Sequence, residues 1–166
     1  MADVWCHDDN KKDIMVKYHD SQKFAQMCNT YTEHMYCVSI PTNKTNIFLL
    51  FNFLDKQAVP TDNNEQIELV KVCNYVGLKI MSVVMRKIYQ SISVTHGLHL
   101  DTIHKYAKSK KDNIYDYKFC VYVLENLNGL LQYQNIMNKI HARNPVHDVM
   151  NNQAIMSRVQ GFYEHL

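Results

Sequence analysis

The sequence predicts an all-α fold: a single-domain bundle of five to six helices around one long apolar helix at about residues 62–95. Three observations support this prediction. Apolar residues recur at spacings of three and four over most of the chain, which is the period of one helix face. Polar segments rich in Asp, Asn, Gly and Pro separate these stretches, as helix caps and stops do. The composition, 46% hydrophobic and 20% charged, is typical of a chain that buries a core.

The N-terminal part is predicted to differ from the rest. Residues 1–19 are polar and show no helical period, so we expect a flexible or loosely docked arm, followed by a helical bundle domain over residues 20–166. Asp20 can cap a helix over 21–38, which Pro41 would end.

Residues 47–54 form the most apolar run of the chain. Periodicity alone leaves strand and helix open for such a run. We expect a short buried helix, because the sequence offers no clear second strand and a lone strand is not stable.

The predicted central helix has a marked start and end. Asp62, followed three residues later by Glu65, forms a capping-box pattern, and Gly97 suits a left-handed helix stop. The middle of the helix is apolar on more than one face, which is typical of a helix surrounded by others. Gly77 lies inside it, so either two backbones approach closely there or the glycine is an unselected surface residue.

Three further helices complete the predicted bundle. They cover residues 101–108, residues 112–142 and, after an Asn-Pro cap, residues 145–163. An all-helical fold around one apolar helix resembles the Bcl-2-like adaptors in architecture. The resemblance does not extend to residues, since Asn126-Leu127-Asn128-Gly129 is a poor match to the N-W-G-R box of that family.

Several classes of protein are excluded by the motifs they require. The four glycines are isolated, which excludes the glycine-rich loops of dinucleotide and P-loop sites, and no G-x-S-x-G or H-E-x-x-H pattern occurs. No apolar run is long enough to span a membrane. The five cysteines are scattered without a C-x-x-C pair, so we expect reduced thiols and an intracellular protein, cytoplasmic or nuclear, without a cofactor.

The leading functional hypothesis is a non-enzymatic protein–protein interaction or adaptor module with a protein partner. Aromatic residues are favoured at interfaces. The candidate partner-binding residues are tyrosines outside the main apolar stripe of the helix over 112–142, and aromatic residues of the last helix, which could dock on a partner or on a second copy: Tyr115, Tyr117, Tyr122, Phe162 and Tyr163. An Asn-, Lys- and Ile-rich composition indicates an A+T-rich coding sequence, which several large DNA viruses share, so a virus-encoded protein is a further hypothesis. A homodimer is a separate hypothesis, because the last helix could dock on a second copy.

Two alternatives use the segment after the central helix. A basic turn at 104–111 could hold the phosphates of a nucleic acid. Its candidate residues are Lys105, Tyr106, Lys108, Lys110 and Lys111. The second alternative is a metal-dependent or histidine-based enzyme using the 96–104 segment. Its candidate ligands are His96, His99 and His104, at a spacing that matches no common zinc site.

Overall fold

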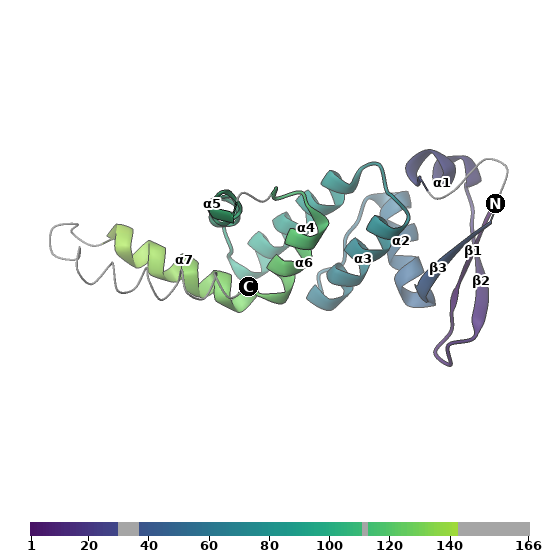
Figure 1. Cartoon of the computed structure of the whole chain (residues 1–166), viewed down its shortest axis with the longest axis horizontal. Coiled ribbons are helices and arrows are strands. Elements are labelled where there is room, and N and C mark those ends of the chain that lie inside the picture. Colours follow the sequence, from purple (N-terminus) through teal and green to yellow (C-terminus); the bar gives the residue numbers. More distant parts are fainter. Residues whose placement is uncertain (30–36, 111–112, 143–166) are drawn as a thin grey trace.

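The computed structural model describes residues 1–29, 37–110 and 113–142. This part of the chain is mostly helical but also contains a three-stranded sheet, so the prediction of an all-α fold is correct only for the helical majority. Figure 1 shows an elongated molecule with the sheet at one end and the helix α7 (Leu127–Ala142) toward the other. None of the described helices is long and apolar enough to cross a membrane.

Residues 2–18 form a β-hairpin, which was not predicted from the sequence. The description of residues 1–19 as a flexible or loosely docked arm stays a prediction. Strand β1 (Ala2–His7) pairs antiparallel with β2 (Asp13–Tyr18), and β3 (Cys37–Asn43) pairs parallel with the other side of β1. The sheet order is therefore β2-β1-β3. A domain boundary at residue 20 stays a prediction.

Strict alternation explains the hairpin. On β1 the small or apolar side chains of Ala2, Val4 and Cys6 are buried, while the residues between them face outward. Residues of a strand point alternately to its two faces, so this pattern builds one inner face. Helices α2 (Lys44–Lys56) and α3 (Asn63–Tyr75) pack against that inner face.

Helix α1 (Ser21–Met27) is much shorter than predicted. The Asp20 side chain caps it by accepting from the Lys23 amide at 3.0 Å, as expected. The helix ends because Cys28 turns extended and forms a β-bridge with Leu78, far along the chain. Pro41 does not end this helix; it lies inside β3.

The apolar run at 47–54 lies within α2, so the prediction of a short buried helix is confirmed. Asn43 caps α2, and its end is tied to the sheet by Asp55. The Tyr18 hydroxyl donates to Asp55 Oδ1 at 2.7 Å, and His19 Nε2 bonds to the same oxygen at 2.7 Å. Burial alone would raise the pKa of the Asp55 carboxyl, but these two bonds, together with the electrostatic effects of His19 and Lys23, outweigh it and the pKa is lowered.

The predicted central helix is wrong as a single element. It is two helices, α3 and α4 (Met81–His96), separated by a turn in which Gly77 has a left-handed φ of 62°. The start and stop were correctly predicted. Asp62 accepts from the Glu65 amide at 3.0 Å, and Gly97 ends α4 with a φ of 70°. Without a long central helix, the architectural resemblance to the Bcl-2-like adaptors is also wrong.

The remaining helices are α5 (Leu100–Lys110), α6 (Tyr117–Glu125) and α7. Helix α5 was predicted as 101–108 and is confirmed. The single helix predicted over 112–142 is instead α6 and α7, which part at Asn126, the C-terminal cap of α6. The helix predicted at 145–163 lies outside the described residues.

Candidate interaction groove

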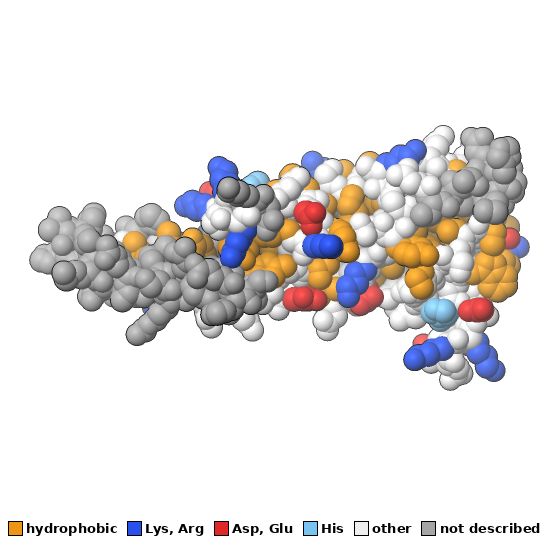
Figure 2. Space-filling view, in the orientation of Figure 1, with side chains coloured by type: hydrophobic (Ala, Val, Ile, Leu, Met, Phe, Trp, Pro, Cys, Tyr) orange, Lys and Arg blue, Asp and Glu red, His pale blue; other side chains and the backbone are white. Residues whose placement is uncertain are grey.

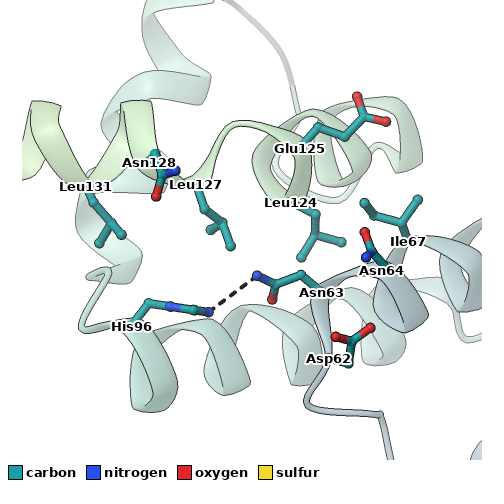
Figure 3. Close-up of a pocket in the computed structure, with 10 residues that line it drawn as sticks. All are labelled: Asp62, Asn63, Asn64, Ile67, His96, Leu124, Glu125, Leu127, Asn128 and Leu131. Atoms are coloured by element: carbon teal, nitrogen blue, oxygen red, sulfur yellow. Dashed lines mark hydrogen bonds between the residues drawn. The ribbon is translucent and has the colours of Figure 1, made fainter.

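A cavity of about 490 Å³ lies where four helices meet. Its walls come from the start of α3, the last residue of α4, and the junction of α6 with α7 (Figure 3). Helix α3 packs against α6, and α6 against α7, so segments far apart in sequence form one groove. The break at Asn126 opens it, because a continuous helix would run straight past the end of α4.

The floor of the groove is apolar. Ile67, Leu124 and Leu127 are almost fully buried yet still line the cavity, and Leu131 is half-buried beside them. Figure 3 shows Leu124, Leu127 and Leu131 pointing down toward the α3 and α4 side, whereas the Glu125 carboxylate points to the outer side of α6. Any group that entered would displace water from these aliphatic surfaces, which is the main favourable contribution to binding.

The rim of the groove is polar and carries negative charge. The Asn63 amide lies 3.4 Å from His96 Nε2 and bridges α3 to the end of α4. Asp62 and Glu125 both belong to the lining, with the Glu125 carboxylate on the outer side of the rim (Figure 3), and no lysine or arginine is among the described residues that line the cavity. The remaining rim residues are Asn64 and Asn128, both exposed amides.

The lining combines aliphatic surface with polar groups that can donate and accept hydrogen bonds. Four aliphatic side chains form the floor and six polar residues form the rim, so the groove is more polar than the usual pocket for a small ligand. Asp62 is committed to capping α3 through the Glu65 amide. Asparagine amides at the rim both donate and accept, which suits the backbone of an incoming peptide.

The predicted partner-binding tyrosines are dispersed rather than gathered in one patch. Tyr115 is exposed just before α6, and Tyr117 is half-buried. Tyr122 stacks on Tyr106 with ring centroids 5.5 Å apart, inside the packing between α5 and α6. Phe162 and Tyr163 lie outside the described residues.

The predicted nucleic-acid-binding residues are likewise partly exposed and partly buried. Lys105 and Lys108 are exposed on α5, while Lys110 is half-buried with an interaction of its own. Tyr106 is 5% exposed and stacks on Phe119 at 5.8 Å, so its ring faces the core instead of a base. Lys111 lies outside the described residues.

The three predicted metal ligands are all exposed and lie on different elements: at the end of α4, in the α4–α5 turn and on α5. His96 lines the groove, the His99 backbone amide donates to Gln134 Oε1, and His104 is exposed on α5. Within the described ranges, no group of three His, Cys, Asp or Glu side chains could hold a metal ion.

Most groove residues were missed as functional candidates. Leu124, Leu127 and Leu131 were visible in the sequence only as a core stripe. The signal that could have found the groove was Asn126 together with Asn128, two weak helix formers beside Gly129 in the middle of a predicted helix. Of the predicted site residues, only His96 lines it.

The chain matches no protein-family model, no curated protein and no solved structure. Its function must therefore be inferred from its own residues.

Proposed function

We propose that this chain is a non-enzymatic protein–protein interaction module and that the groove between α3, α4 and the α6–α7 junction binds a peptide segment of its partner. The observation that carries the proposal is an apolar floor that remains open to solvent under a polar rim. Figure 2 shows further apolar surface between charged side chains of both signs, over the region where α3, α4 and α6 lie. Such apolar surface on a folded chain is typical of interaction sites.

The chemistry of the groove defines the partner segment. One aliphatic or aromatic side chain would fill the space above Leu124 and Leu127. The carboxylates of Asp62 and Glu125 favour a flanking Lys or Arg, because opposite charges across an interface steer the encounter and fix the register. A strongly acidic segment would be repelled.

The test is selection from a displayed library of random peptides, with the folded chain as bait. We expect enriched peptides to combine an apolar anchor with a basic residue. Titration calorimetry with a synthetic version should show affinity weakened about ten-fold by Glu125→Lys, which reverses a rim charge. The substitution Leu131→Asp, which makes the floor polar, should abolish binding.

Glu65→Lys is the matched control, because Glu65 is exposed on α3 yet does not line the groove. It makes the same charge change as Glu125→Lys and should leave affinity unchanged. The proposal fails if no peptide is enriched over the Leu131→Asp bait, or if the two lysine variants bind alike.

The two alternatives have less support. For nucleic-acid binding through residues 104–111, Lys105 and Lys108 are exposed and could contact phosphates. The ring of Tyr106 is buried and could not stack on a base. An enzyme based on residues 96–104 would need its histidines to act together, and they lie on different elements.

An intracellular location is part of the same proposal. All five cysteines are free thiols, four of them buried. Burial raises the pKa of the Cys28 and Cys120 thiols to about 12, so both are neutral and unreactive at physiological pH. Free buried thiols are common in reducing compartments.

A further inference from the structure

Strand β2 is an edge of the sheet, and one set of its backbone groups faces away from β1. At the hairpin turn the Asp8 amide donates to the Lys12 carbonyl at 2.9 Å. In an antiparallel ladder, every second pair of facing residues is hydrogen-bonded. Counting from the bonded pair Asp8–Lys12 along the register, the even-numbered residues of β2 are the ones that bond to β1. The amides and carbonyls of Asp13, Met15 and Lys17 therefore point outward along the free edge.

The side chains of these three residues are arranged symmetrically about Met15. Asp13 lies two residues before it and Lys17 two residues after it, and all three are exposed. If this strand meets an identical strand running antiparallel, with Met15 opposite Met15, each Asp13 falls opposite a Lys17. The same register places Ile14 opposite Val16 on the inner face, where both are half-buried.

The two edges of the sheet differ in how well they can pair with another strand. On β3 the exposed edge contains Pro41, which has no amide to donate and hinders pairing. Strand β2 has no proline, and its charges are of both signs rather than the repeated lysines that usually protect an edge. Figure 1 places β2 at the end of the molecule away from α7, and no described element lies beyond it.

We propose that β2 is a homodimerisation edge: it pairs antiparallel with β2 of a second copy, joining two three-stranded sheets into a continuous six-stranded sheet. Three residues on each strand offer one donor and one acceptor apiece, so about six backbone hydrogen bonds form across the twofold axis. The Asp13–Lys17 pairs fix the register. This inference is independent of the groove and of what the groove binds.

One strand pair buries less surface than a large permanent interface. The dimer is therefore expected to be concentration-dependent, with monomer and dimer in equilibrium in the micromolar range or above. Sedimentation velocity over a series of concentrations measures this directly.

Two single charge reversals give a sharp test. Asp13→Lys gives a strand with lysine at positions 13 and 17, and Lys17→Asp gives one with aspartate at both positions. In a dimer of either variant alone, like charges therefore face each other at each end of the strand pair. Each should raise the dissociation constant about ten-fold or more. An equimolar mixture of the two variants restores opposite charges at both ends and should dimerise at least as well as the unaltered chain.

The matched control is Asp9→Lys, the same charge change at an exposed residue of the hairpin turn outside β2. It should dimerise as the unaltered chain does. The Asp13 side chain is 79% exposed, so its replacement should leave the fold intact, which circular dichroism checks. Should a charge variant unfold, Met15→Pro removes a central outward amide at an edge position that tolerates proline, and it should also dissociate the dimer.

Three outcomes would overturn the proposal. The first is an unaltered chain that stays monomeric at every concentration. The second is dimerisation that neither charge reversal weakens, which would place the contact elsewhere. The third is a mixture of the two variants that fails to associate where the unaltered chain does, which would exclude this register.

Discussion

Two turns of the helical region both need a left-handed backbone conformation but differ in how tightly the rest of the molecule packs around them. Gly77, between α3 and α4, and Gly97, between α4 and α5, both have left-handed φ values, 62° and 70°. A Cβ atom at Gly77 would lie 2.9 Å from the Asn29 Cβ, whereas one at Gly97 would meet nothing within 4 Å. The first turn is closed by the rest of the molecule, and the second is open to solvent.

The neighbouring contacts make the same distinction. At the first turn the Asn29 amide donates to the Gly77 carbonyl at 3.3 Å, and the Lys79 amide donates to the Met27 carbonyl at 2.9 Å. These bonds join the end of α1 to a segment about fifty residues later. At the second turn side chains make the connections: Gln134 Nε2 of α7 donates to the Gly97 carbonyl at 2.7 Å, and the Asn63 amide of α3 lies 3.4 Å from His96 Nε2. A glycine thus serves tertiary packing at one turn and local helix termination at the other.

The largest effect is expected from Gly77→Ala. The left-handed backbone costs an L-residue about 1–2 kcal/mol, and the contact with Asn29 adds overpacking of about 1–3 kcal/mol. We expect the free energy of unfolding to fall by about 3 kcal/mol in urea denaturation. The double variant Asn29→Gly with Gly77→Ala should recover the steric part in a double-mutant cycle. Strictly additive effects would mean that Asn29 does not close this turn.

A smaller effect is expected from Gln134→Ala. This side chain is 6% exposed, and its Oε1 accepts from the His99 amide at 2.6 Å and from the Thr102 hydroxyl at 3.1 Å. Removing it leaves polar groups of the turn without partners, at a cost of about 2 kcal/mol. Gln132→Ala, an exposed glutamine of the same helix, is the control and should change the thermal midpoint very little. Equal effects of the two would show that Gln134 does not hold this turn.

The smallest effects are expected at Gly97. Gly97→Ala should cost about 1 kcal/mol through backbone conformation alone. Gly97→Asn should lower the free energy of unfolding by only a few tenths of a kcal/mol, because asparagine tolerates the left-handed region. Asparagine at Gly77 should remain damaging, since its Cβ meets Asn29 just as alanine's does. The comparison breaks down if asparagine is tolerated equally at both turns.

The contrast explains which parts of the fold could be predicted. The stop at Gly97 was visible because Thr95, His96 and His99 mark a change to polar residues there, even though Leu98, directly after the glycine, is buried. The turn at Gly77 was hidden because its neighbours Val76 and Leu78 are buried, so the apolar pattern continued through it. A turn packed in the core has no polarity change to mark it.

The strands were missed for a different reason. The alternation in β1 and β2 was present in the sequence, on either side of an Asp- and Asn-containing turn, and could have been recognised. The third strand offers only Val38 and Ile40 as buried residues, and its partner on β1 lies more than thirty residues earlier. Parallel pairing at that distance leaves little trace in local pattern.

The groove was predictable only in its parts. The sequence identified Leu124, Leu127 and Leu131 as apolar and His96 as a candidate, but not that they meet. Their meeting depends on the break at Asn126 and on the packing of α3 against α6. The sequence also left open whether the candidate tyrosines form one patch, because that depends on helix rotation; in the structure Tyr122 stacks on Tyr106.

The sequence by itself determined the local features: the caps at Asp20 and Asp62, the buried helix through residues 47–54, and the stop at Gly97. Each depends on interactions within a few residues, which composition and spacing report. Tertiary structure decided the parallel pairing of β3 with β1, the turn at Gly77 and the groove. Each of these depends on segments that are distant in the chain and become neighbours only when apolar faces are buried together.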